Sequence, residues 1–173
     1  MSELQNKGID FLTYGHMPII LPMSISPKII KGGILMAKKM VMGIASGNLE
    51  KLTVAGIILS GAVAQDMEVK VFLLLGGSYA FKKDIAEDFK DVKEFPELKQ
   101  QFMEGLKNAN VPYWLEYFKQ AKEFEKVEII ACGTAGKIWG AEKLEDFNEI
   151  VDDIGGISEY ISAIEESDMS ILI

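Results

Sequence analysis

Residues 40–49 read Met-Val-Met-Gly-Ile-Ala-Ser-Gly-Asn-Leu, and this stretch decides the fold. The uninterrupted apolar run from Met40 to Ala45 is typical of a strand that is covered on both faces of a sheet. Asn48 then offers a suitable N-cap, and Leu49–Gln65 is apolar nearly all round and rich in small residues. We therefore expect a buried strand, a short loop, and a helix that packs in the core or against another subunit.

Strands and helices alternate along the rest of the chain. Val69–Leu75 and Val127–Ala131 are further apolar runs, a short strand is expected near Ile150, and Ile171–Ile173 is expected as an edge strand. Such alternation predicts a parallel sheet with helices on both faces, joined by right-handed crossovers. The predicted class is α/β, a three-layer α/β/α fold with a central, mostly parallel sheet of about five strands, like flavodoxin and Rossmann folds.

The helices between these strands are predicted from apolar spacing and from proline. Apolar residues recur at helical spacing over 81–92, and Pro96 and Pro112 each suit the first turn of a helix. A last helix is expected over Ile157–Glu166. The aromatic residues after Pro112 also have helical spacing, which favours packing in the core or an interface over a stacking platform for bases.

The composition fits one compact domain that does not bind nucleic acid. Of 173 residues, 49% are apolar and 25% are charged, which excludes a disordered chain. All 18 basic residues are lysine against 26 acidic residues, so no arginine can read phosphates or guanine edges, and the net charge of −8 repels nucleic acid. Between Glu142 and Asp168, ten acidic residues face Lys143 alone. This stretch is either a solvated surface or a docking face for a basic partner.

Residues 1–33 differ from residues 34–173. Pro18 and Pro22 interrupt the apolar start, so we expect an extended arm, followed by an α/β domain over 34–173. The start lacks the pattern of a secretory signal, and no apolar run is long enough to span a membrane. Together with a single cysteine, this leads us to expect a cytoplasmic protein. His16, the only histidine, is either a packing side chain of the arm or an acid or base for a site.

Cys132 is the candidate reactive residue. One cysteine and one histidine form neither an intramolecular disulfide nor a Cys/His zinc site, and we expect no bound metal. Ligands of parallel sheets bind at the carboxyl ends of the strands, near a topological switch point. Cys132 follows a strand there, and two other loops are expected to meet it and shape a pocket; these are Ser46, Gly47, Asn48 and Gly76, Gly77, Ser78.

The residues after Cys132 favour a negatively charged sulfur if they begin a helix. Free backbone N–H groups of the first turn would then point back at the sulfur, together with the positive end of the helix dipole. The expected thiolate-stabilising residues are Gly133, Thr134, Ala135, Gly136 and Lys137. Alternatively, Cys132 is a small buried apolar residue without reactivity. No phosphate-binding glycine motif is present, so we expect no cofactor, although FMN at the sheet edge stays open.

The ordered set of motifs resembles the DsrE/DsrF-like sulfur-relay proteins, especially the branch labelled peroxiredoxin-like. The resemblance covers about residues 38–173. In the first half it rests on Ser46–Lys51 and Gly61–Phe72, and in the second half on Val111-Pro112, Ile129–Cys132 and Gly155-Gly156, with Ser167–Ile173 at the end.

The resemblance implies an α/β domain that assembles into a homo-oligomer. It also implies that Cys132 takes sulfane sulfur and passes it to a partner carrier protein, either as a sulfurtransferase or as a carrier without turnover. With a single cysteine, an intramolecular two-cysteine peroxidase cycle is excluded. Two other functions remain open: a non-catalytic binding or assembly module, and a small-molecule or flavin binder at the same edge.

Overall fold

A computed structural model describes residues 13–14, 17–18 and 38–173 of the chain. Five strands form one parallel sheet in the order β6-β5-β4-β3-β7. The strands are β3 (Lys39–Ile44), β4 (Glu68–Leu73), β5 (Val127–Cys132), β6 (Asp153–Gly155) and β7 (Met169–Leu172). The helices are α1 (Leu49–Ala64), α2 (Leu75–Ala80), α3 (Lys99–Asn108), α4 (Trp114–Lys122), α5 (Gly133–Trp139) and α6 (Ile157–Glu165).

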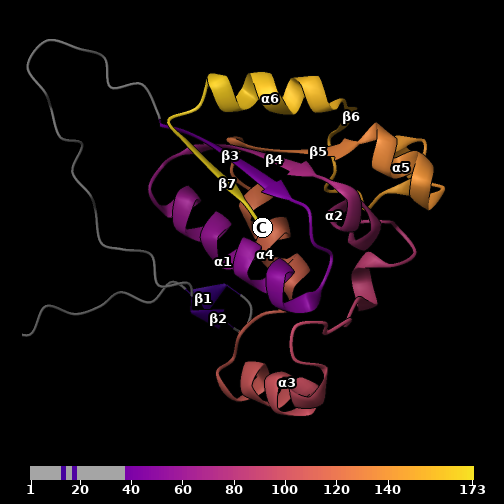
Figure 1. Cartoon of the computed structure of the whole chain (residues 1–173). Coiled ribbons are helices and arrows are strands. Elements are labelled where there is room, and N and C mark those ends of the chain that lie inside the picture. The colour runs from indigo at the N-terminus through magenta and orange to yellow at the C-terminus, as the bar shows by residue number, and fades with distance from the viewer. Residues whose placement is uncertain (1–12, 15–16, 19–37) are drawn as a thin grey trace, which may run out of the picture.

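Helices cover both faces of the sheet, which confirms the predicted three-layer α/β fold (Figure 1). From β3 to β6 each new strand is added on the same side, and α1 and α4 lie on one face. After β6 the chain crosses back to place β7 on the other side of β3. Because the direction of travel reverses, a right-handed crossover puts α6 on the opposite face. The topological switch point therefore lies between β3 and β7.

The two faces carry cores of unequal size. The larger core lies against α1 and α4; its fully buried members include Met42, Ile44, Leu52, Leu59, Val71, Leu73, Phe81, Trp114, Phe118 and Ile129. Among the described residues, the buried members of the core under α6 are Val41, Phe72, Ile130 and Tyr160, with partly buried side chains packed against them. The aromatic residues after Pro112 pack in the larger core, as predicted: the Trp114 ring lies 4.9 Å from that of Phe81.

Two local predictions are wrong. Gly76, Gly77 and Ser78 do not form a loop but lie within α2, which starts two residues after β4 ends. Residues 81–92 do not form the expected amphipathic helix. They contain only a short 3-10 turn (Ala86–Asp88), because Phe81 and Phe89 reach the core from an irregular path that also pairs Lys82 with Phe147.

Only a few residues of the N-terminal arm are described. Thr13–Tyr14 (β1) pairs antiparallel with Met17–Pro18 (β2). The rest of the arm predicted over 1–33, the first residues of the domain predicted over 34–173, and His16 lie outside the described residues. Within the described part of the chain, no helix combines the length and apolar character needed to cross a membrane.

Candidate functional site

Cys132 is the last residue of β5 and the N-cap residue of α5. It lies in the interior of the sheet at the carboxyl edge, with β4 on one side and β6 on the other, where it pairs in register with Gly155. Its side chain is half-buried and free of any disulfide. The strand and the helix thus hold the thiol at a fixed place, and solvent reaches it.

The residues after Cys132 do begin a helix, the condition on which stabilisation of the thiolate by its first turn depends. Gly133, Thr134 and Ala135 make up the first turn of α5, and the first N–H groups of a helix have no partner within it. Ala135 and Gly136 are buried, and a Cβ on Gly136 would lie 2.2 Å from the backbone oxygen of Ala141, so Gly136 serves close packing. Lys137 is exposed in the second turn.

Helix N-termini gather along this edge of the sheet. Since every strand of the sheet is parallel, α1, α2, α5 and α6 all start at the carboxyl end of the strand before them. The N-terminus of a helix carries partial positive charge. The edge around Cys132 is therefore more favourable to a negatively charged group than the overall charge of −8 suggests.

Ser46–Asn48 and the start of α2 come together beside the site, but they pack against each other. The N–H of Gly76 donates to the oxygen of Ala45 at 3.0 Å. A Cβ on Gly47 would lie 2.1 Å from the oxygen of Gly76, and one on Gly77 would lie 2.2 Å from that of Ile44. The three glycines therefore close the space between the ends of β3 and β4, where we expected them to shape a pocket.

The polar members of the expected pocket also have structural roles. Asn48 is buried, and its Oδ1 accepts the N–H of Lys51 at 2.9 Å, so it caps α1 as predicted. Ser78 is fully buried and its hydroxyl donates to the oxygen of Leu73. Asn48 thus caps its own helix, and Ser78 ties α2 to the end of β4.

Exposed apolar side chains flank Cys132 on both sides. Leu73 pairs in register with Ala131, so Leu75 follows the end of β4 just beyond the level of Cys132, and it is 54% exposed. Ile157 starts α6 directly after β6 and is 57% exposed. Neither residue was expected from the sequence. Each is the first residue of its helix, after the N-caps Leu74 and Gly156, and an exposed apolar residue at such a position looks the same in sequence as a buried one.

Leu75 is held in a conformation that non-glycine residues seldom adopt, with φ of 21°. The Trp139 indole fixes it from α5, because its Nε1 donates to the oxygen of Leu75 at 2.9 Å. The Trp139 ring also lies 4.9 Å from that of Tyr79 in α2. The two short helices beside the thiol are thus tied together through Trp139.

Two cavities lie away from Cys132. One of about 410 Å³ separates α3 from α1, and one of about 550 Å³ lies near Glu87 and Asn148. Within the part of the chain that the structure describes, no three His, Cys, Asp or Glu side chains are grouped to hold a metal ion.

Comparison with known proteins identifies no function for this chain. No protein-family model matches the sequence, and none of the curated proteins matches it significantly. Among solved structures, a protein of unknown function from Methanobacterium thermoautotrophicum, MTH1491, is similar, with a TM-score of 0.47 and 13% identity. The alignment covers 79% of this chain and 99% of that protein.

Proposed function

We propose that this protein is a sulfur carrier that takes sulfane sulfur on Cys132 and passes it to a second protein. The observation that carries the proposal is the placement of the thiol. Cys132 is half-exposed in the interior of the carboxyl edge, where parallel α/β sheets bind their ligands, and it directly precedes a helix. A residue that served only to fill the core would be fully buried here, as its neighbour Ala131 is.

The chemistry needs one cysteine and no bound cofactor. The Cys132 thiolate attacks the outer sulfur of a donor persulfide, the donor's S–S bond breaks, and the donor leaves as a thiolate. Cys132 then carries the persulfide. Attack by the thiolate of an acceptor on the outer sulfur returns Cys132 to its starting state. Each step exchanges one S–S bond for another, so no external oxidant or reductant is consumed.

The residues around Cys132 support both steps. The N–H groups of Gly133 and Thr134 lie in the first turn of α5, where they stabilise negative charge on the attacking or leaving sulfur. Leu75 and Ile157 give a partner an apolar surface on either side of the thiol. We also propose a reducing compartment, the cytoplasm, because a free, half-exposed thiol would not persist under oxidising conditions.

The acidic C-terminal region suits a basic partner at this site. Asp153 of β6 and Glu159 of α6 lie on elements next to Cys132, and both are exposed. An acceptor with basic residues around its own cysteine would be drawn to this side of the molecule. Its binding should weaken as the salt concentration rises, since salt screens exposed charges.

Intact-mass measurement tests the proposal. Reduced protein is incubated with glutathione persulfide, beside Cys132→Ser as the matched control. We expect the wild type alone to gain the mass of one sulfur atom and to lose it again on addition of a thiol. A wild type that gains no sulfur refutes the proposal.

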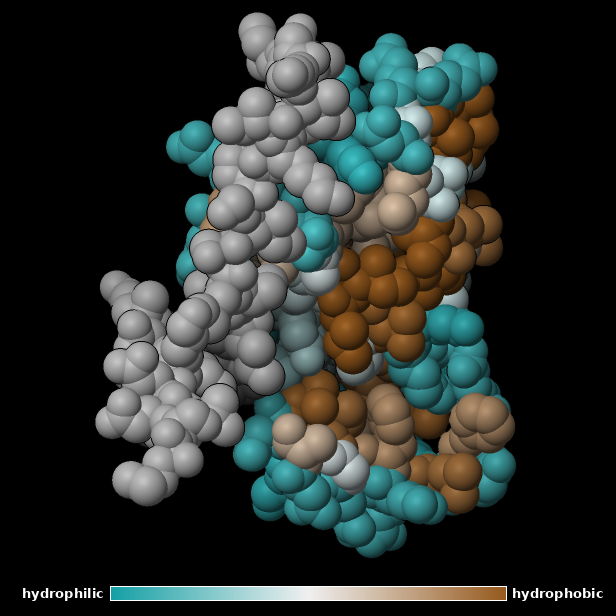
Figure 2. Space-filling model, turned by 90° about the vertical axis from the view of Figure 1, so that its left-hand side faces the viewer, coloured by the Kyte–Doolittle hydropathy of each residue, from teal (hydrophilic) through white to brown (hydrophobic). Residues whose placement is uncertain are grey.

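A second candidate function is a homo-oligomeric assembly module in which Cys132 is inert. An open sheet edge favours it: β7 pairs only with β3 among the described strands, and its Leu172 is 63% exposed. Val54 and Ile57 of α1 are also exposed, and Figure 2 shows apolar side chains gathered on one face of the molecule. Unpaired strand edges with apolar neighbours readily pair with another chain. Slow alkylation of Cys132 in an oligomeric protein would favour this function over sulfur transfer.

A further inference from the structure

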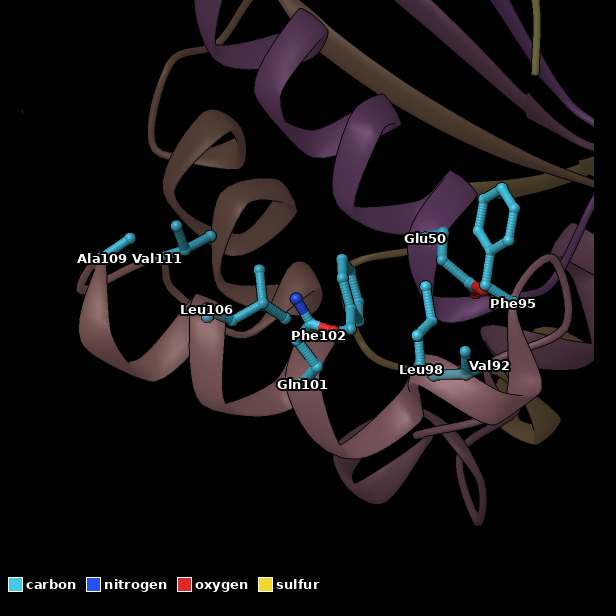
Figure 3. Close-up of a pocket in the computed structure, with 10 residues that line it drawn as sticks. Glu50, Val92, Phe95, Leu98, Gln101, Phe102, Leu106, Ala109 and Val111 are labelled. Atoms are coloured by element: carbon cyan, nitrogen blue, oxygen red, sulfur yellow. The ribbon is translucent and has the colours of Figure 1, made fainter.

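A groove between α3 and the body of the domain is built like a small-molecule site. α3 has no buried residue, and it encloses a cavity of about 410 Å³ against α1, which lies within the usual range for ligand pockets. Figure 3 shows Leu98, Phe102 and Leu106 of this segment along one wall. The 3-10 turn at Pro96–Leu98 leads into α3, and Phe102 and Met103 of this helix are partly buried against the main core.

The shape of the groove suits a single short chain. Ala109 and Val111 lie at one end, and Val92 and Phe95 lie at the other (Figure 3). The ten residues of α3 give a length of about 15 Å between these ends.

The walls show which ligand chemistry would fit. Of the lining residues that the structure describes, only Glu50 and Gln101 have polar side chains, and none is a lysine. The Glu50 carboxylate is already engaged, because it accepts the N–H groups of Lys93 and Glu94 at 3.1 and 3.0 Å. It lies at one end of the groove. A ligand with a negative group would find no cationic partner among the lining residues that the structure describes.

We propose that this groove binds an uncharged, medium-length aliphatic molecule, with the alkyl chain lying along α3. The site is separate from Cys132 and does not depend on the proposed sulfur transfer. Its chemistry is hydrophobic burial, since nearly all of the lining is apolar. An extended ten-carbon chain has about the length of the groove, so decan-1-ol is the probe of choice.

Calorimetric titration with decan-1-ol and decanoate tests this inference. We expect saturable one-to-one binding of decan-1-ol and about tenfold weaker binding of decanoate, because no described lining residue is a cation that could pair with the carboxylate. Gly105 lines the groove, and a Cβ there meets nothing within 4 Å. Gly105→Phe should therefore fill the groove and weaken decan-1-ol binding at least about tenfold without loss of folding.

A matched pair of exposed phenylalanines controls for surface effects. Phe95 lines the groove and is 56% exposed, whereas Phe124 follows α4 outside it and is 50% exposed. Phe95→Ser should weaken decan-1-ol binding, and Phe124→Ser should leave it within about twofold. The inference is overturned if the binding of decan-1-ol does not saturate, or if Gly105→Phe binds decan-1-ol as tightly as the wild type does. It is also overturned if Phe95→Ser changes the oligomeric state, because the groove would then be an interface between copies of the chain.

Discussion

The glycines of this chain differ in the space that faces their missing side chain. A Cβ on Gly61 or Gly105 meets nothing within 4 Å, and both residues lie inside helices. A Cβ on Gly77, in contrast, would lie 2.2 Å from the backbone oxygen of Ile44. Gly61 and Gly105 therefore lower the stability of their helices without allowing any close contact. Gly77, in contrast, allows α2 to approach β3.

We predict opposite effects of alanine at these positions. Gly61→Ala and Gly105→Ala should each raise the free energy of unfolding by about 0.5–1 kcal/mol, because alanine is the better helix former. Gly77→Ala should lower it by about 1–3 kcal/mol, because backbone must shift to admit the methyl group. Urea denaturation measures all three. A stabilised Gly77→Ala would show that the contact between α2 and β3 is looser than described.

Glu87 is the carboxyl group whose titration reports most directly on a side-chain contact. Its Oε1 accepts hydrogen bonds from Lys119 Nζ at 3.0 Å and from Asn148 Nδ2 at 3.1 Å. The bond from Lys119 lowers the pKa of Glu87 below its ordinary value, and this outweighs the slight burial. A lowered pKa adds stability above the pKa of the unfolded chain, and this stability is lost as the pH falls through the folded pKa.

Removal of the lysine should therefore move this titration upward. In Lys119→Met the pKa of Glu87 should rise toward its ordinary value, as followed by carbon NMR of the carboxyl group. Lys126→Met, which removes a lysine that pairs with Asp66, is the control and should leave Glu87 unchanged. An unchanged pKa in Lys119→Met would mean that the ion pair does not form in solution.

Among the elements, those with a strong pattern and a clear cap were predictable. The strand at Met40–Ala45, the helix from Leu49 and the strand before Cys132 were all confirmed. The helix expected over residues 81–92 was wrong, because apolar residues that reach the core from an irregular path can share the spacing of a helix. The loop expected at Gly76–Ser78 was wrong because glycine, which usually marks a loop, here permits close contact between backbones.

The cap of α1 gives a prediction for this element. Asn48→Ala removes the acceptor of the Lys51 N–H and should cost about 1 kcal/mol of the free energy of unfolding. Asn48→Asp keeps the acceptor and adds a charge that suits the helix N-terminus, so it should be close to neutral or stabilising. Equal losses in both variants would mean that burial of the amide, and not the cap, is what matters.

For the molecule as a whole, the fold was predictable, and the surroundings of the thiol were not. Cys132 was placed correctly at the carboxyl edge, since strand order alone brings it there. The contacts between the glycines were beyond prediction because they depend on how closely β3 and α2 approach. Leu75 and Ile157 were missed because an exposed apolar residue looks the same in sequence as a buried one.

The open edge at β7 gives a prediction about assembly. We expect the wild type to form a dimer or a larger oligomer through this edge, with exposed Leu172 at the contact. Leu172→Lys should shift it toward the monomer in sedimentation velocity, whereas Leu144→Lys, at an exposed leucine outside the sheet, should not. A monomeric wild type at micromolar concentration would remove the assembly function from consideration.

The rate at which Cys132 is alkylated by iodoacetamide at neutral pH, in the native protein and in urea, tests the central claim most directly. The unfolded chain supplies the reactivity of the same thiol without its surroundings. If the sheet edge and α5 hold an exposed, activated thiolate, the native protein reacts faster than the unfolded chain. A native protein that reacts more slowly than the unfolded chain would show that Cys132 is a protected packing residue and would contradict its assignment as the sulfur-carrying group.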